Sequence, residues 1–171
     1  MKNKRAVKYK NVNLDALDLK IMNLLQKNAK ISNTRIAKEI GLTPPSTLER
    51  VKKLEDSGII EGYYTRFNKE RIKYAITTFV GISLSCHNKE HFEQFNQMLK
   101  ELPQVVECYH TTGKYDFLLK VIARDIKGLH EFLMNQLNFS SLIGHVETFL
   151  ILKEDHYGMD VTSLCGHLIG K

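Results

Sequence analysis

Apolar residues recur at helical spacing three times in the first third of the chain. The first stripe consists of Leu17, Ile21, Leu24 and Leu25. Asp15 stands before that stripe, where it can cap a helix. Residues 32–57, SNTRIAKEIGLTPPSTLERVKKLEDS, predict two further helices joined by a turn at 41–43, because Ser32 and Thr43 can cap them and Gly41 can end the first. Two short helices around so tight a turn indicate a helix-turn-helix.

The second helix of that pair has an apolar side and a polar side. Its leucines and Val51 are expected to face a core, which turns its small and charged residues toward solvent. Such a surface suits the major groove of DNA, and Arg50 is the predicted base contact. Glu49 either accepts a hydrogen bond from a cytosine amine or pairs with Lys53 one turn later. An ordinary solvated helix face is the alternative. The predicted DNA contacts are Ser46, Thr47, Glu49, Arg50, Lys53 and Arg66.

Arg66 belongs to a segment that reads as a wing. Residues 59–67, IIEGYYTRF, predict two short strands around Gly62. A hairpin at this place would put Arg66, Tyr63 and Tyr64 near a phosphate backbone. Packing within the hairpin is the other interpretation for the two tyrosines.

The second half of the chain changes between alternating and helical patterns. Alternation predicts strands at 76–85, 105–112, 115–123 and 146–152, and helical spacing predicts helices at 88–102 and 126–137. The order βαββαβ is that of a ferredoxin-like domain. The predicted fold class is therefore α+β, an N-terminal winged helix-turn-helix followed by a ferredoxin-like domain. Two helices on one face of the sheet leave Phe79, Tyr109 and Phe149 on the other, so we expect this face to pair with another copy.

Charge is distributed unevenly along the 171 residues. Residues 1–73 hold 17 Lys and Arg against 8 Asp and Glu, whereas residues 74–171 hold 8 against 11. A basic half beside a mildly acidic one is typical of a phosphate-binding domain joined to a domain with another task. The expected organisation is a basic arm at 1–13, a DNA-binding domain at 14–67, a polar linker at 68–75, a ferredoxin-like domain at 76–153 and a C-terminal tail at 154–171.

The two ends have weaker patterns. The arm is interpreted either as a flexible segment that adds salt-sensitive DNA affinity or as a solubilising tail. In the C-terminal tail, Val161, Leu164, Leu168 and Ile169 suggest a short helix that would pack at an oligomer interface.

Several classes of chemistry lack a signal in the sequence. No apolar run has membrane-spanning length and no export signal is visible, so we expect a soluble, cytoplasmic protein without a membrane partner. The three cysteines are widely spaced, which predicts buried thiols rather than disulfides or a metal site. His87 and His91 lack a nearby third ligand. Without a nucleophile motif or phosphate loop, we expect no enzyme, catalytic residue, metal or cofactor.

The two domain patterns together resemble one family, the Lrp/AsnC (feast/famine) transcriptional regulators. The resemblance covers residues 14–153, and it rests most on LERV at 48–51, on GII at 58–60 and on the turn Gly113-Lys114-Tyr115-Asp116. It implies a regulator that binds double-stranded DNA. It also implies a homodimer formed through the sheets, a higher oligomer such as an octamer, and a small-molecule effector, such as an amino acid, bound between dimers.

Carried over by position, the resemblance assigns the effector site to the hairpin after the second strand. Gly113 would expose backbone N–H groups to a carboxylate, and Asp116 would hold an ammonium group. Alternatively, Asp116 bonds local backbone and merely shapes the turn. The sequence His145-Val146-Glu147-Thr148 departs from the small hydroxyl common in relatives. The effector residues assigned are Tyr109, Thr111, Thr112, Gly113, Tyr115 and Asp116.

Two other functions share this organisation. One is an enzyme like the siroheme decarboxylases, and the other is a small-molecule-sensing adaptor that does not bind DNA. The basic arm and the cluster Arg50, Lys52 and Lys53 favour DNA binding over both.

Overall fold

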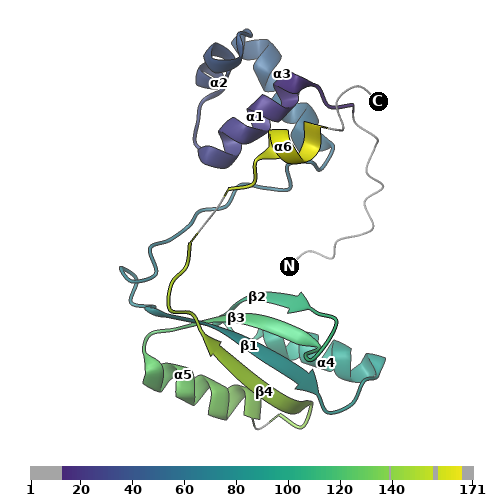
Figure 1. Ribbon diagram of the computed structural model, residues 1–171, viewed down its shortest axis with the longest axis vertical. Coiled ribbons are helices and arrows are strands. Elements are labelled where there is room, and N and C mark those ends of the chain that lie inside the picture. Colours follow the sequence, from purple (N-terminus) through teal and green to yellow (C-terminus); the bar gives the residue numbers. More distant parts are fainter. Residues whose placement is uncertain (1–12, 139, 156–157, 167–171) are drawn as a thin grey trace. The chain divides into compact units, whose positions relative to one another are not determined.

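The computed structural model describes residues 13–138, 140–155 and 158–166, which form two compact units. The first unit contains residues 13–66 and 158–166, and the second contains residues 67–155. Figure 1 shows that the first is helical and that the second is built on a sheet. The expected basic arm, apart from Asn13, lies outside the described residues.

The helical unit has the three helices that the sequence predicts. They are α1 (Ala16–Lys27), α2 (Asn33–Ile40) and α3 (Pro44–Asp56). Their apolar stripes meet in one core, in which Leu19, Ile36 and Leu54 are almost completely buried. Gly41 ends α2 with a φ of 76°, a conformation that an L side chain rarely adopts. Thr43 caps α3, and Pro44 opens it, where no intrahelical hydrogen bond is lost. The helix-turn-helix is therefore confirmed.

The predicted two-stranded wing is wrong, because residues 59–67 form no strand. The N–H of Ile60 donates to the carbonyl of Leu54 at 3.0 Å, so the backbone after Gly58 is bonded to the helix end instead of a strand ladder. Ile59 and Ile60 pack against the helical core. The Tyr63 hydroxyl donates to Glu55 at 2.7 Å. Burial first and this hydrogen bond second raise the pKa of Tyr63 to about 12. Tyr63 is thus bonded to the end of α3, although its side chain is 47% exposed.

The C-terminal tail contributes to the helical unit. A short helix, α6 (Val161–Cys165), contacts α1, and Val161 is buried in the same core as Leu19 and Ile21. The side chain of Asn23 in α1 accepts from the N–H of Val161 at 3.0 Å and donates to the Thr162 hydroxyl. The helix expected from the sequence is present, and Val161 packs within its own chain. Leu168 and Ile169 lie outside the described residues.

The second unit has the predicted βαββαβ order. Its elements are β1 (Ile76–Leu84), α4 (Lys89–Lys100), β2 (Val105–His110), β3 (Phe117–Ala123), α5 (Ile126–Phe132) and β4 (Ile143–Leu150), and a π-helical segment, Leu133–Asn138, extends α5. The strands form one antiparallel sheet in the order β2-β3-β1-β4, which Figure 1 shows with its two helices. This is the ferredoxin-like topology.

The two faces of the sheet differ in cover. On one face, Phe117, Leu119 and Val121 alternate into a core with Phe95 of α4 and Phe132 of α5. On the other face, Phe79 lies opposite Phe149, and Tyr109 lies opposite Leu118. Tyr109 is 47% exposed and Phe149 43% exposed. The apolar residues expected on the uncovered face are confirmed there.

The segment predicted as a polar linker is locally structured. The N–H of Tyr74 donates to the carbonyl of Lys69 at 2.8 Å, and Lys73 takes a φ of 61°. The ammonium group of Lys69 donates to the Thr77 hydroxyl at 2.7 Å and pairs with Glu154. The hydrogen bond from Lys69 is the main cause that lowers the pKa of Glu154.

We expect Val161→Ala to loosen the helical unit by roughly 1–2 kcal/mol, because it removes buried methyl groups at the α1 contact. Faster amide hydrogen exchange in α1 would show it. The matched control is Leu164→Ala on the same helix, where the side chain is 57% exposed and the effect should be small. Unchanged exchange in Val161→Ala would mean that α6 does not stabilise α1.

Candidate functional site

The orientation of α3 differs from the one expected from the sequence. Its inward stripe is Thr47, Arg50, Val51 and Leu54. Leu48, expected in the core, is 40% exposed. The face directed to solvent includes Pro45, Leu48, Glu49 and Lys52. The apolar residues alone did not fix the rotation of the helix, because two of its four inward side chains are polar.

Thr47 is buried because its hydroxyl has a partner inside the helix. It donates to the carbonyl of Thr43 at 3.0 Å, which satisfies its polar group without solvent. The side chain is 0% exposed. Thr47, expected as a DNA contact, is therefore placed inside the helical unit, where its side chain does not reach the surface.

Arg50 faces the start of α1 and not the outside of α3. Its Nη1 donates to Asp15 at 2.7 Å and to Asp18 at 2.8 Å. Lys53 approaches the other oxygen of Asp18 at 2.8 Å, and the Asp18 side chain is completely buried. Asp15 and Asp18 also form the capping box of α1. One cluster therefore caps α1 and fixes α3 against it, and Arg50 is not available as a free base contact.

The cluster shifts the protonation of its members. Burial raises the pKa of Asp15, but hydrogen bonds from the Asp18 N–H and from Arg50 outweigh it, so the net shift is downward. The hydrogen bonds to Asp15 and Asp18 raise the pKa of Arg50. The ion pair between Asp15 and Arg50 thus stays formed at neutral pH and is lost as acid protonates Asp15.

The remaining predicted DNA contacts are placed as follows. Glu49 is exposed and has no ion pair in the described part of the chain, so the alternative pairing with Lys53 does not form. Lys53 instead binds Asp18 and the carbonyl of Asn13. Ser46 is half-buried, near the start of α3. Arg66 is exposed, and within the described residues its side chain has no partner.

The sequence interpretation did not place Pro45 and Leu48 on the outer face of α3, and it counted Lys52 only as part of a basic cluster. Lys52 is exposed and makes no ion pair with any described residue. Asp18, three residues after the cap of α1, was the available signal, because a cation of a neighbouring helix can pair with a carboxylate in that turn. If Arg50 pairs with this carboxylate, helical spacing places Pro45, Leu48 and Lys52 on the opposite face of α3.

The β2–β3 hairpin has the backbone form that the sequence suggests. Gly113 takes a φ of 122°, and a Cβ built on it meets no atom within 4 Å. Glycine is thus favoured at this position by the backbone conformation and not by a lack of space for a side chain. The N–H of Thr111 donates to the carbonyl of Asp116 at 3.0 Å, and the Thr111 hydroxyl donates to the carbonyl of Tyr115. Thr112 and Gly113 are exposed at the tip.

Asp116 bonds the backbone of a neighbouring strand. Its Oδ2 accepts from the N–H of Leu84 at 2.8 Å, where a register shift between Ser83 and Leu84 interrupts the ladder. His87 lies 3.1 Å from the same oxygen. Oδ1 has no hydrogen-bond partner in the described part of the chain, and the side chain is 18% exposed. Asp116 therefore shapes the hairpin with one oxygen and keeps the other free.

Tyr115 lies on the uncovered face of the sheet, over a glycine. A Cβ built on Gly81 would come within 2.8 Å of the Tyr115 ring. The Tyr115 hydroxyl donates to Glu147 of β4, which also pairs with Lys114. The hydrogen bond from Lys114 is the main cause that lowers the pKa of Glu147, and the hydrogen bond from Tyr115 is the second. The sequence interpretation missed Gly81 as part of the site, although glycine inside a strand is a signal of close approach.

Tyr109 stands apart from the turn, on β2. Its hydroxyl donates to Glu107, and this hydrogen bond is the main cause that raises the pKa of Tyr109. The hairpin thus brings together Thr111, Gly113, Tyr115 and Asp116, whereas Tyr109 lies within strand β2 and not in the turn.

Among residues 13–138, 140–155 and 158–166, no three His, Cys, Asp or Glu side chains come close enough to hold a metal ion. His91 bonds the Asn88 cap of α4. The His110 ring packs between Phe92 and Phe117, with centroids at 6.1 and 4.3 Å. No helix in the same residues is long and apolar enough to cross a membrane.

Comparison with known proteins covers both units. A family model described as winged helix-turn-helix DNA-binding matches residues 14–61, and one described as Lrp/AsnC ligand binding domain matches 77–159. The leucine-responsive regulatory protein of Haemophilus influenzae is 36% identical over 88% of this chain and 91% of its own. The transcriptional regulator AzlB of Bacillus subtilis is 34% identical over 83% and 90%.

Solved structures agree in fold. A transcriptional regulator from Neisseria meningitidis in complex with L-Met has a TM-score of 0.83 and 27% identity, and the match covers 91% of this chain and 99% of that one. AsnC of Escherichia coli has a TM-score of 0.77 and 29% identity, with 86% and 98% covered.

We expect Arg50→Ala to destabilise the helical unit by up to about 3 kcal/mol, because it leaves a buried carboxylate with Lys53 as its remaining charged partner. Urea unfolding, with amide hydrogen exchange in α1 and α3 as the local readout, measures this loss of stability. Lys52→Ala, two residues away on the outer face, is the control and should stay within about 0.5 kcal/mol of the unmutated chain. Equal stability of the two variants would contradict the role given to Arg50.

Proposed function

This chain belongs to the Lrp/AsnC family of transcriptional regulators, and we propose that it binds duplex DNA through the outer face of α3 and senses an amino acid at the β2–β3 hairpin. The observation that carries the first part is the orientation of α3. Its charged inner face is fully engaged by α1, and its outer face carries Glu49 and Lys52 without intramolecular partners in the described residues.

The outer face of α3 fits a recognition surface. Pro45 and Leu48 supply apolar contacts of the kind that meet thymine methyl groups, and Glu49 can accept from a cytosine amine. Lys52 can reach a guanine edge or a phosphate, and Arg66 can reach the backbone. Rigid attachment of α3 to α1 supports this assignment, because base recognition depends on a fixed helix orientation.

The hairpin supports the second part of the proposal. An amino acid presents a carboxylate and an ammonium group. Gly113 can offer backbone N–H groups to the carboxylate, and the free Oδ1 of Asp116 can accept from the ammonium. The Neisseria relative was solved with L-Met. Which amino acid this chain takes depends on the side-chain part of the site, near Tyr115 and Glu147.

A dimer follows from the uncovered sheet face and from the symmetry of DNA sites. Phe149 and Tyr109 are exposed apolar groups on a face that carries no helix in the described residues. A second copy would bury them, and a two-fold assembly would present two recognition helices to paired half-sites. The named relatives are bacterial regulators, which supports the cytoplasm as the place of action.

For DNA binding, we expect Lys52→Ala to weaken the specific complex by roughly 1–3 kcal/mol if Lys52 reads a base, and to reduce the salt slope by about 1 if it contacts a phosphate. Mobility-shift titrations at several salt concentrations distinguish these results. Lys100→Ala on α4 removes the same charge from the other unit and should leave the affinity unchanged. If both variants bind like the unmutated chain, α3 does not use Lys52 for recognition.

For the effector, we expect Asp116→Asn to reduce amino-acid affinity roughly tenfold or more, because an ammonium loses its charged acceptor. Asparagine can still accept from the Leu84 N–H, so the hairpin should keep its form. Calorimetry against the twenty amino acids, with both proteins, is the measurement. Undiminished affinity in Asp116→Asn would restrict Asp116 to shaping the turn. Absence of binding to the unmutated chain would remove the amino acid from the proposal.

A further inference from the structure

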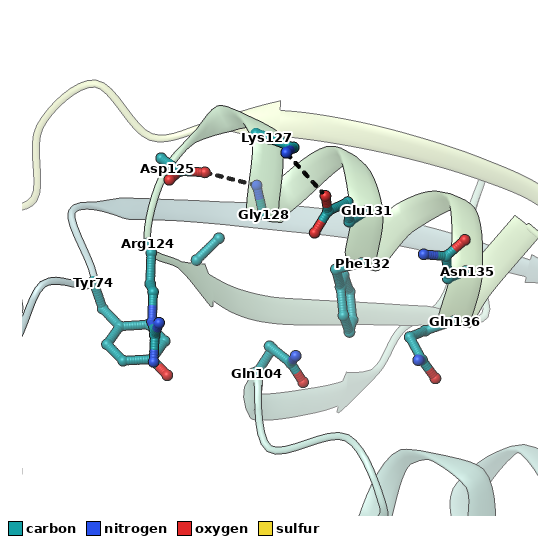
Figure 2. Close-up of a pocket in the computed structure, with 11 residues that line it drawn as sticks. Tyr74, Gln104, Arg124, Asp125, Lys127, Gly128, Glu131, Phe132, Asn135 and Gln136 are labelled. Carbon is teal, nitrogen blue, oxygen red and sulfur yellow. Dashed lines mark hydrogen bonds and ion pairs between the residues drawn. The ribbon is translucent and has the colours of Figure 1, made fainter.

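A second pocket lies at the far end of β3 from the effector hairpin. It has a volume of about 510 Å³ and is lined by residues at the end of β3 and along α5, together with Tyr74 and Gln104. Figure 2 shows Gln104 and Phe132 beneath α5, and Tyr74 beside the start of that helix. The volume lies within the range of small-molecule sites. The hairpin residues Gly113 and Asp116 are not among its lining residues.

The charged groups of the pocket are unequally engaged. Asp125 accepts from the N–H of Gly128 at 2.7 Å, and Lys127 pairs with Glu131 at 3.8 Å. Arg124 makes no ion pair with any carboxylate in the described part of the chain. Figure 2 shows its side chain extended along Tyr74, away from Asp125. Arg124 and Asp125 thus both lack an ion-pair partner among the described residues, and the exposed Arg124 guanidinium is the unpaired cation of this pocket.

Tyr74 holds that guanidinium in place. The Arg124 Cζ lies 5.7 Å from the centre of the Tyr74 ring, within the range of a cation–π contact. This contact orients the side chain but neutralises none of its charge. A guanidinium fixed on a ring keeps its N–H groups for a planar anion and loses less conformational entropy when it binds one.

The uncharged groups of the pocket add hydrogen-bond donors. The side-chain amides of Gln104, Asn135 and Gln136 line it and have no hydrogen-bond partner in the described residues. Figure 2 shows Gln104 and Gln136 below the helix and Asn135 against its last turn in the view, away from the Lys127 pair. An amide both donates and accepts, so together with Arg124 these groups can surround an oxyanion that carries further polar substituents.

We propose that this pocket is a second ligand site, separate from the amino-acid site, and that it takes a small organic or inorganic oxyanion, a carboxylate or a phosphate, through Arg124. The guanidinium forms the two parallel hydrogen bonds that such anions accept. The amides of Gln104, Asn135 and Gln136 contact the remainder of the ligand.

The test is calorimetry of the full chain at constant ionic strength with three probes: inorganic phosphate, pyrophosphate and succinate. We expect saturable binding of at least one, with a Kd on the order of 1 mM or below. Tighter binding of phosphate or pyrophosphate identifies a phosphate site, and tighter binding of succinate identifies a carboxylate site. Absence of saturable binding by all three overturns the proposal.

Variants assign the binding to this pocket. Arg124→Gln should weaken it roughly tenfold or more, whereas Arg71→Gln removes the same charge from an exposed residue outside the pocket and should not. Asn135→Ala should weaken it less than Arg124→Gln. Equal losses in Arg124→Gln and Arg71→Gln would indicate general charge attraction and overturn the proposal. Asp116→Asn should leave this binding intact, which separates it from the amino-acid site.

Discussion

The buried carboxylate of Asp18 is the constraint on which the helical unit depends. It is completely inaccessible, so it must be matched by charge and hydrogen bonds, and Arg50 and Lys53 supply both from α3. Because two cations of α3 must face α1, the rotation of α3 is fixed and its opposite side stays exposed. A packing requirement inside the unit thereby decides which side chains of α3 reach the surface. The same carboxylate completes the capping box of α1, so one side chain both caps this helix and fixes α3 against it.

Much of the fold was predictable because it follows from periodicity. The three helices, the caps at Asp15, Ser32 and Thr43, and the βαββαβ order all rest on spacing and on local capping chemistry. The rotation of α3 was not predictable in the same way. A rule that places polar residues outside sends Thr47 and Arg50 to solvent, and only long-range partners at residues 15 and 18 bring Arg50 inward. The prediction of a two-stranded wing was wrong for a similar reason. The N–H of Ile60 bonds a carbonyl at the end of α3, and local pattern does not reveal that contact.

The hairpin is bonded to two strands outside it, β1 and β4. Asp116 bridges to β1 at the register shift, and Tyr115 crosses to β4 over Gly81. The sequence indicated the turn through Gly113. Glu147 and Gly81 lie in strands far from the turn along the chain. Glu147 carries no local signal, and the signal of Gly81 is only that a glycine stands inside a strand. Residues that meet only through sheet register are found from the structure, because a shift of one position would move each of them to the other face.

The chain passes from the helical unit into the sheet-containing unit and then returns to the helical unit. The helical unit contains residues from both sides of the sheet-containing unit, since α6 packs on α1 after β4 has ended. Two segments therefore join the units, at residues 66–67 and at the return after residue 155. Val161 of the second segment is buried in the same core as Leu19 and Ile21 of α1, so residues that follow the sheet in the sequence complete the helical unit.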